Sequence, residues 1–243
     1  MSANEVLLLI GHGSVRYPGA GDAMGLVAGS PLLKSRFADV ATALLNGSPN
    51  VAEALSRIGP ATIRVVPFFM ESGYFTRVAV PRALAGRTAV ICPPVGVHDG
   101  MARLIGQQAL AACDAWGIQP RTAAVLVVGH GSSSAPGRAL ALHRHVAQVA
   151  ATARFAQVRA ACLEEPPFVA NALQDLRAHP VVVIGFFANR GGHVQDDVPA
   201  LIAAEQAVRG SAGPIVRFYG CVTGDPAMDS IVLDQAALGA TEN

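Results

Sequence analysis

The chain has 243 residues, of which 51% are hydrophobic and 14% charged, enough for one large core or two small ones. A formal net charge of +1 and the lack of a basic run argue against a nucleic-acid partner. Gly, His or Arg interrupts the apolar runs well before bilayer length, which argues against a membrane protein. The first residues lack the basic segment of a secretion signal, and the four cysteines show no CxxC spacing. We therefore expect a cytoplasmic protein with small, buried, reduced cysteines.

Taken in chain order, the sequence alternates strands with helices. Short Val-, Ile- and Leu-rich runs predict strands at 5–10, 39–45, 62–67, 88–92, 123–128, 157–163, 181–186 and 214–219. Longer Ala-rich segments predict helices, among them 99–115, 138–152, 166–178 and 196–208. Alternating βα units are typical of a parallel sheet with helices on both faces.

One sequence frame occurs twice, with a shift of 118 residues. Gly11-His12-Gly13-Ser14 falls on Gly129-His130-Gly131-Ser132, and PFFMESGYFTRVAVP at 67–81 falls on GFFANRGGHVQDDVP at 185–199. After this stretch the second copy gains several residues around 205–213. We interpret the pattern as an internal duplication whose copies, 1–118 and 119–243, each have the size of a compact α/β domain. The prediction is two similar halves, each with a four-stranded parallel sheet, facing each other across a cleft.

Polar side chains follow three strands of the second copy. His130 comes directly after the first strand, Glu164 and Glu165 end the second, and His193 lies in the loop after the third. The carboxyl ends of parallel strands meet at one edge, where open α/β sheets bind ligands. Imidazole pairs suit ions such as Co, Ni, Fe and Zn, and a nearby carboxylate can take a proton or complete the coordination shell. Two imidazoles with open positions would hold the ion loosely.

The first copy keeps only part of this set. His12 remains, but Asn46 matches Glu164, Phe75 matches His193, and Val78-Ala79 match Asp196-Asp197. One imidazole without its partners is a poor metal site. The first copy is therefore expected to be degenerate, retained as a wall of the cleft.

Other interpretations of these residues stay open. His193 could cap the helix that follows it, and the Gly-His-Gly turns could be structural in both copies. Glu164 and Glu165 could be a solvated pair at a strand end. We expect both aspartates of 196–197 to serve the helix N-terminus, where carboxylates favour the helix dipole.

Two further histidines lie on the predicted helix 138–152. His143 and His145 are two residues apart and so point to different faces. Both are interpreted as surface residues.

The motifs LVVGHGSSS, CLEEPPF and FFANRGGHVQDDVP together resemble the sirohydrochlorin chelatase family, the CbiX-type cobalt chelatases and their siroheme ferrochelatase relatives, in its doubled form. The resemblance implies ATP-independent insertion of a divalent metal, Co²⁺ or Fe²⁺, into sirohydrochlorin or a related tetrapyrrole. It also implies that His130 and His193 hold the metal, that Glu164 is the nearby carboxylate, and that no organic cofactor is needed. Doubled members typically carry the complete histidine pair in the amino-terminal half, whereas this chain carries it in the carboxy-terminal half.

The implied partners are the tetrapyrrole and the metal ion, and both a monomer and a homodimer stay open. Arg138, Arg190, Arg77 and His12 are the candidate contacts for the acidic macrocycle. The main alternative function is a metal or tetrapyrrole binding protein without catalysis. Phosphate chemistry is disfavoured because GHGSSSAPG matches neither the P-loop nor the dinucleotide-binding motif, and a serine hydrolase because the G-x-S-x-G elbow is missing.

Overall fold

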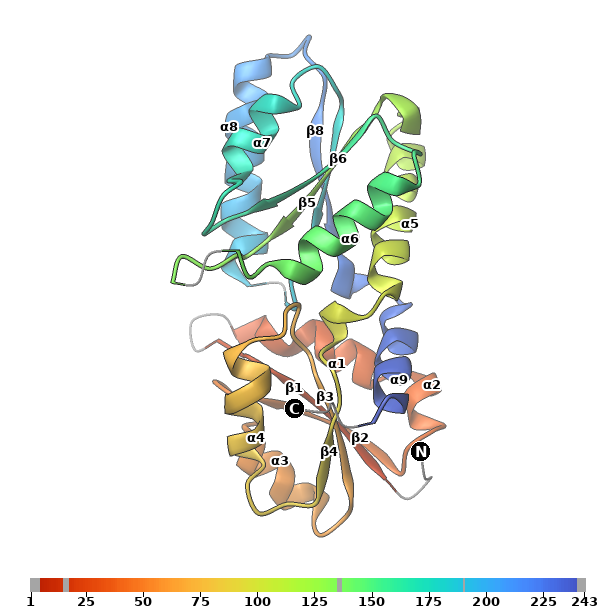
Figure 1. The fold of residues 1–243 in the computed structure, drawn as a ribbon, viewed down its shortest axis with the longest axis vertical. Helices are drawn as coiled ribbons and strands as arrows, with labels where there is room; N and C mark the ends of the chain where they lie inside the picture. The colour runs from red at the N-terminus through yellow and green to blue at the C-terminus, as the bar shows by residue number, and fades with distance from the viewer. Residues whose placement is uncertain (1–4, 15–17, 135–136, 190, 240–243) are drawn as a thin grey trace. The chain divides into compact units, whose positions relative to one another are not determined.

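The computed structural model describes residues 5–14, 18–134, 137–189 and 191–239. They form two four-stranded parallel sheets, with strand orders β2-β1-β3-β4 and β6-β5-β7-β8 (Figure 1). The strands are β1 (Val6–Gly11), β2 (Asp39–Leu44), β3 (Ile63–Pro67), β4 (Ala89–Ile91), β5 (Ala124–Gly129), β6 (Gln157–Cys162), β7 (Val181–Gly185) and β8 (Val216–Cys221). The predicted fold class is confirmed, and each expected strand is present within a few residues.

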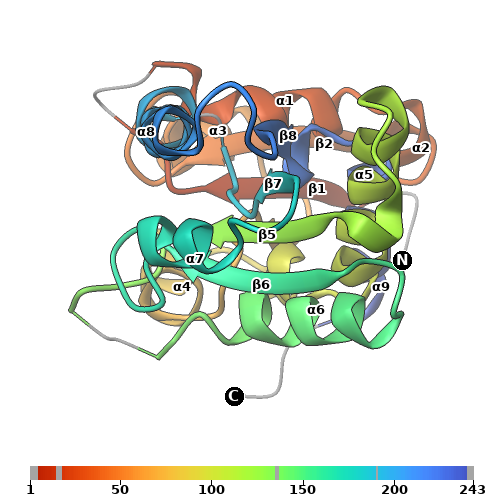
Figure 2. The ribbon, with the colours of Figure 1, turned by 90° about the horizontal axis from the view of Figure 1, so that it is seen from above.

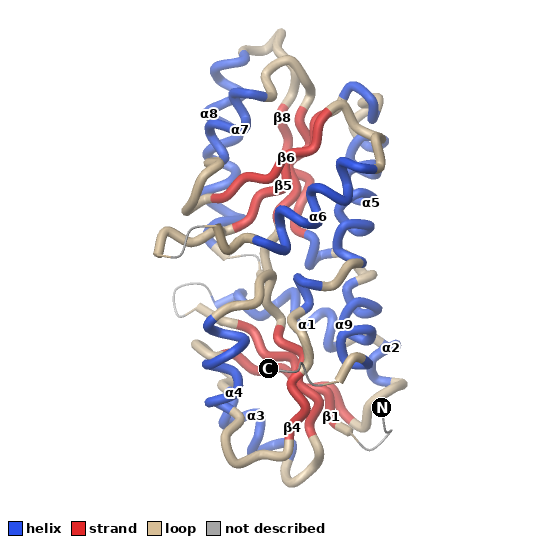
Figure 3. Tube along the Cα trace, in the orientation of Figure 1, coloured by secondary structure: helices blue, strands red, loops and turns tan. Residues whose placement is uncertain are grey.

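Helices cover both faces of each sheet (Figure 3). One face of the first sheet is covered by α1 (Asp22–Ala28), α2 (Pro31–Lys34) and α9 (Met228–Ala237), and the other face by α3 (Val51–Ile58) and α4 (Val80–Ala83). One face of the second sheet is covered by α5 (Gly100–Ala115) and α6 (Leu140–Ala151), and the other face by α7 (Val169–Asp175) and α8 (Val198–Arg209). Figure 2 gives a second view of β5 beside β6, with α6 along β6.

The central strands explain why these runs fold as they do. Every residue of β1, β5 and β7 is buried, which suits strands that have neighbours on both sides and helices on both faces. Alternate side chains serve opposite layers, so that Leu126 and Val128 join the core beneath α7 and α8. A mostly apolar sequence thus specifies the framework.

The chain divides into two compact units that do not coincide with the sequence repeat. The first unit comprises residues 1–98, 188–191 and 223–243, and the second comprises 99–187 and 192–222. Helix α5, which ends the first copy, packs in the second unit, and α9, which ends the second copy, packs in the first (Figure 1). The repeats therefore exchange their last helices. The predicted boundary at 118/119 describes the repeat and not the compact units, and the expected cleft stays a prediction.

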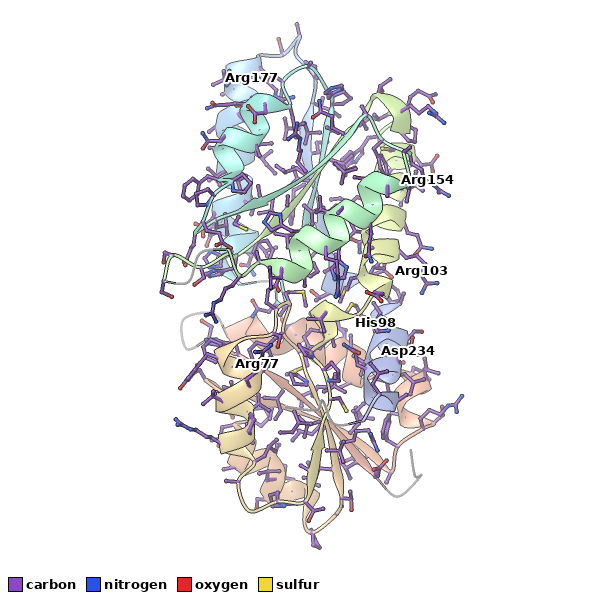
Figure 4. All side chains as sticks on the ribbon, in the orientation of Figure 1. Arg77, His98, Arg103, Arg154, Arg177 and Asp234 are labelled. Atoms are coloured by element: carbon purple, nitrogen blue, oxygen red, sulfur yellow. The ribbon has the colours of Figure 1, made fainter. Side chains whose placement is uncertain are left out.

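Specific contacts hold the exchanged helix α9 in the first unit. Gln235 donates to the carbonyl of Pro94 at 2.6 Å, and Arg64, paired with Glu5 at 2.9 Å, donates to the carbonyl of Ala236 at 2.9 Å. Figure 4 labels a further pair, His98 and Asp234, whose Nε2 and Oδ2 atoms are 3.7 Å apart. These hydrogen bonds fix the position of α9, because leaving a buried carbonyl unpaired costs about 1–3 kcal/mol.

Short irregular turns complete the fold. Single 3₁₀ turns occur at Pro18–Gly21, Val95–Val97, Pro120–Thr122 and Val222–Gly224. More unusual are two π-helical turns at equivalent places, Phe75–Ala79 leading into α4 and His193–Asp197 leading into α8. Such turns are rare and often mark functional sites. Helix α8 is also longer than α4, in line with the residues gained by the second copy.

Burial settles several expectations about single residues. Cys92, Cys113, Cys162 and Cys221 are free and buried, as predicted. His143 is exposed, but the expectation for His145 is wrong: its ring is fully buried against Phe186, with centroids 5.7 Å apart, and Nδ1 lies 3.3 Å from an oxygen of Gln148. Among the described residues, no helix is long and apolar enough to cross a membrane.

A buried ionic network ties the second unit together behind α7 and α8. The Arg209 side chain is 2% exposed and donates to Glu205 at 3.1 Å and to the carbonyls of Leu173, His179 and Pro214. Arg177, just after α7 (Figure 4), forms a second pair with Glu205 at 2.8 Å but is 46% exposed. The Arg209 guanidinium is therefore the buried centre of the network, and the Arg177 guanidinium lies at its solvent-exposed edge.

We predict that Arg209→Met destabilises the protein far more than Arg177→Met. Removing the buried guanidinium leaves the carbonyls of Leu173, His179 and Pro214 without their donor and takes from the buried Glu205 carboxylate its buried partner, and breaking such a pair costs about 3–5 kcal/mol. Arg177→Met removes only the half-exposed partner of Glu205. The measurement is the free energy of unfolding in urea by circular dichroism. Equal losses in the two variants would contradict this account of the network.

The same network predicts an acid-sensitive contribution to stability. Hydrogen bonding from Arg177, aided by Arg209, lowers the pKa of Glu205 below its ordinary value of 4.5. The stabilisation is thus complete above that value and is lost as pH falls through the lower, folded-state pKa. Between about pH 7 and pH 3, wild type should lose more unfolding free energy than Glu205→Gln in parallel urea titrations. Parallel curves for the two proteins would be the contrary result.

Candidate metal site

The candidate site is built at the carboxyl edge of the second sheet. Strand β5 is central, pairing in parallel with β6 on one side and β7 on the other. His130 directly follows β5, Glu164 follows β6, and His193 follows β7 after a connecting loop. The topology therefore delivers the three side chains to one edge, as the sequence predicted.

Backbone hydrogen bonds extend the ladder beyond the strands and fix the position of His130. The amide of Glu164 donates to the carbonyl of His130 at 2.9 Å, and the amide of Phe186 donates to Val128 at 2.7 Å. Gly131 has a φ of +72°, and a Cβ there would lie 2.7 Å from Cγ of Glu165. Glycine is required because the turn needs a left-handed conformation and a close approach.

The two imidazoles lie together. The ring centroids of His130 and His193 are 4.5 Å apart, with an interplanar angle of 85°. Nδ1 of His130 is 3.0 Å from the carbonyl oxygen of Gly131, and Nδ1 of His193 is 2.7 Å from Oδ2 of Asp197. Carbonyl and carboxylate oxygens only accept, so each Nδ1 carries the proton. The remaining nitrogen, Nε2, then has a lone pair on each ring, the form that binds a metal.

Only one of the two glutamates joins this pair. Oε1 of Glu164 is 3.7 Å from Nε2 of His130, too far for a hydrogen bond but close enough to approach an ion held at Nε2. Glu165 is 2% exposed and instead accepts a hydrogen bond from the amide of Gly137. Glu164 therefore faces the imidazoles, while Glu165 holds the loop that follows His130.

Asp197 is the site residue that sequence reasoning missed. Its backbone is helical and joins the π-helical turn directly to α8, and its side chain makes no capping hydrogen bond, so the expected capping role is wrong for this residue. Its carboxylate contacts His193, four residues earlier in the π-helical turn. The spacing His-x-x-x-Asp was a visible signal for such a contact.

The site is open to solvent. The side chains of His130, Glu164 and His193 are 48%, 43% and 40% exposed. Within the described part of the chain, no three or more His, Cys, Asp and Glu side chains are grouped to hold one ion. An open pair of neutral imidazoles suits an ion that arrives and leaves more than one that is stored.

The first unit repeats the backbone of this site with different side chains. The backbone N–H of Asn46 donates to the carbonyl of His12 at 2.8 Å, as the backbone N–H of Glu164 does to the carbonyl of His130 at 2.9 Å. The rings of His12 and Phe75 are 4.4 Å apart at 88°, close to the values for His130 and His193. The backbone frame of the candidate site is thus repeated in the first unit, with a phenyl ring in place of the second imidazole.

The described candidate substrate contacts come from both units. His12 donates from Nδ1 to the carbonyl of Gly13 at 2.8 Å, and its Nε2 is 3.5 Å from the side-chain nitrogen of Asn46. Arg77 is exposed on the π turn of the first unit (Figure 4), with Nε 3.2 Å from Ser72 Oγ. Arg138 is exposed in the second unit, whereas Arg190 lies outside the described residues.

Comparisons with known proteins agree with this duplicated arrangement. A protein-family model described as CbiX matches twice, over residues 6–112 and 124–237. The probable sirohydrochlorin cobaltochelatase of Halobacterium salinarum (strain ATCC 700922 / JCM 11081 / NRC-1) is 25% identical, with 96% of this chain and 91% of that protein aligned.

Solved structures share the fold. DR2241 from Deinococcus radiodurans, a multi-domain protein with structural similarity to chelatases, has a TM-score of 0.83 and 25% identity, covering 99% of this chain. This chain spans only 56% of DR2241, which has two additional domains. A structure of CbiX, described as the terminal enzyme for biosynthesis of siroheme in denitrifying bacteria, has a TM-score of 0.75 and 27% identity, covering 97% and 99% of the two chains.

The matched frames predict that the first unit can be converted into a metal site. Phe75→His, Asn46→Glu and Ala79→Asp together place in the first unit the set that the second unit carries. We expect this triple variant to bind two Co²⁺ ions per chain where wild type binds one, measured by calorimetry. Asn46→Glu with Ala79→Asp alone is the matched control and should still bind one. A single ion in the triple variant would show that the two frames are not equivalent.

Proposed function

We propose, since the chain belongs to the CbiX family, that it is an ATP-independent chelatase that inserts Co²⁺ or Fe²⁺ into sirohydrochlorin or a related tetrapyrrole. The observation that carries the proposal is the imidazole pair of His130 and His193, 4.5 Å apart, with both Nδ1 atoms engaged. Two Nε2 lone pairs at a solvent-exposed edge suit a divalent ion that is delivered rather than kept.

The proposed chemistry is an exchange of ligands. The ion, a substrate of the reaction, passes from the imidazole nitrogens to pyrrole nitrogens of the macrocycle, and two pyrrole N–H groups each lose a proton. Glu164, 3.7 Å from His130, is placed to accept a proton at Oε1, and each imidazole can accept one at Nε2 once it has released the ion. General base assistance of this kind contributes about 10²–10⁴-fold in rate.

The proposed identity of the metal rests on ligand chemistry and on relatives. Imidazole and carboxylate ligands accept Co²⁺ and Fe²⁺ alike, so supply and geometry decide between them. The Halobacterium salinarum relative is named for cobalt, and the CbiX relative of known structure is described as an enzyme of siroheme biosynthesis. We put Co²⁺ first, in a pathway to cobalamin, and Fe²⁺ for siroheme second.

The setting of the reaction is also part of the proposal. The macrocycle is expected to bind at the carboxyl edge of the second sheet, in the cytoplasm, with its carboxylates near exposed arginines such as Arg138. In this scheme the first half, with Phe75 in place of the second imidazole, contributes no second reaction centre.

A binding protein without catalysis is the second candidate. The observation in its favour is the loss of the metal-binding set from the first unit, where Phe75 packs against both His12 and Phe69. A family member that had lost turnover could retain affinity for a metal or a tetrapyrrole. The two candidates differ in one measurable property, which is the rate of insertion above the spontaneous rate.

The test is the absorption spectrum of sirohydrochlorin mixed with Co²⁺ and the full chain. Wild type should accelerate insertion, and His193→Ala should remove the acceleration while the circular dichroism spectrum is unchanged, because the ion loses one of its two imidazoles. Glu164→Gln should slow insertion by about 10²–10⁴-fold and still bind the ion, because it removes only the proton acceptor.

The matched control is His143→Ala. It removes an exposed histidine of α6, which is not one of the residues that follow the strands and form the candidate site, and it should keep the wild-type rate. If His193→Ala inserts metal as fast as wild type, the assignment of the site is wrong. If wild type binds Co²⁺ through His193 but never exceeds the spontaneous rate, the binding protein is the better description.

A further inference from the structure

We propose that Asp197 is a positioning residue for the reaction: its carboxylate holds the His193 ring in the orientation and tautomer that present Nε2 to the incoming ion. The inference rests on the proposed function, in which His193 receives a divalent metal. It adds to the site a residue that does not itself need to touch the metal.

The first observation is the contact itself. Oδ2 of Asp197 is 2.7 Å from Nδ1 of His193, the length of a charge-assisted hydrogen bond. Because the carboxylate can only accept, the proton is kept on Nδ1 and the lone pair on Nε2. Carboxylates that fix metal-binding histidines in this way commonly change metal affinity by about 10–100-fold when removed.

The second observation is that the Asp197 side chain makes no hydrogen bond to the helix backbone. Its dihedral angles are helical (φ −70°, ψ −51°) and the π-helical turn runs directly into α8, so there is no helix end at this residue for the carboxylate to cap. Its side chain remains 56% exposed and reaches back toward His193. The carboxylate is thus directed at the imidazole and not at the helix.

The third observation is an internal control supplied by the duplication. The first unit forms the same π-helical turn over Phe75–Ala79, followed directly by α4, with Phe75 in place of His193 and Ala79 in place of Asp197. The turn therefore forms without a carboxylate at this position. Where the histidine is missing the aspartate is missing too, which links Asp197 to the imidazole and not to the fold.

The surrounding rings complete the support for His193. Phe187 stacks against it, with centroids 6.3 Å apart and an interplanar angle of 24°, and His130 meets it edge to face at 85°. These contacts restrict the plane of the ring but allow the ring to flip within that plane. The hydrogen bond to Asp197 is what distinguishes Nδ1 from Nε2.

An ordinary surface ion pair is the competing explanation, and it predicts something different. Exposed i,i+4 pairs contribute only about 0.3–0.5 kcal/mol to stability and do not affect ligand binding. A positioning role instead predicts a large change in metal affinity at unchanged stability.

The experiment compares metal-free full-length wild type with Asp197→Ala, Asp197→Asn and Asp196→Asn. Calorimetric titration with Co²⁺ alone gives the dissociation constant, and ¹⁵N NMR of the imidazole rings gives the His193 tautomer without metal. We expect Asp197→Ala to raise the dissociation constant about 10–100-fold, with Asp197→Asn in between because its amide oxygen still accepts from Nδ1. The ring of His193 should be protonated at Nδ1 in wild type and should populate both tautomers in Asp197→Ala.

Asp196→Asn removes the neighbouring exposed carboxylate of the same turn and should match wild type in Co²⁺ affinity and in the His193 tautomer. The inference is overturned if Asp197→Ala binds Co²⁺ within about twofold of wild type, where a supporting contact predicts at least tenfold. It is also overturned if the His193 tautomer is the same in both proteins, or if Asp196→Asn weakens binding equally.

The outcomes separate this inference from the proposed function. If Asp197→Ala weakens Co²⁺ binding and shifts the tautomer, but wild type inserts no metal into sirohydrochlorin, the chelatase proposal fails and the role of Asp197 stands. If wild type inserts metal while Asp197→Ala equals it in affinity and tautomer, the role of Asp197 fails and the chelatase proposal stands.

Discussion

The site depends on the position of β5 between β6 and β7. A parallel strand with parallel neighbours on both sides brings the carboxyl ends of three strands to one edge of the sheet. Residues that are far apart in sequence therefore become neighbours through strand pairing alone. His130 occupies the centre of that edge, with the segments carrying Glu164 and His193 on either side. Moving β7 relative to β5 would separate the imidazoles, and moving β6 would take Glu164 away from them, whereas changing the side chains at the edge leaves the sheet as it is.

The duplication demonstrates that independence of site from framework. The two units share the sheet order, the register of the central strand with both of its neighbours and the hydrogen bonds that follow the first strand, yet only one carries the complete set of ionisable side chains. Phe75 takes the place of His193 with almost the same ring geometry toward the neighbouring histidine. The exposed edge thus contributes chemistry, while the buried strands and the Glu205 and Arg209 network contribute stability.

Sequence reasoning predicted the features that follow from local patterns. All eight strands were predicted, and the central ones most directly, because strands buried on both faces are continuous apolar runs. The order of the strands placed His130 and His193 on the same edge. The exchange of α5 and α9 was not predictable, because an apolar helix face does not specify which of two similar sheets it covers.

Three details of single residues needed the structure for related reasons. The sequence does not show which of two adjacent glutamates faces the site. In the structure Glu165 is buried and accepts a hydrogen bond from Gly137, so Glu164 is the one near His130. A π-helical turn has no periodicity distinct from that of an α-helix over so few residues, so Asp197 was interpreted as a capping residue. His145 was assigned to the surface together with His143, although residues two apart point to different faces of a helix; the buried face of α6 includes His145.

The central claim is that His130 and His193 hold one ion together through Nε2. X-ray absorption spectroscopy of the Co²⁺-loaded chain measures this directly, because imidazole rings give a distinctive multiple-scattering pattern. The account predicts two imidazole nitrogens at about 2.1 Å from cobalt in wild type and one in His193→Ala. A coordination shell with no imidazole, or one unchanged by His193→Ala, would contradict it.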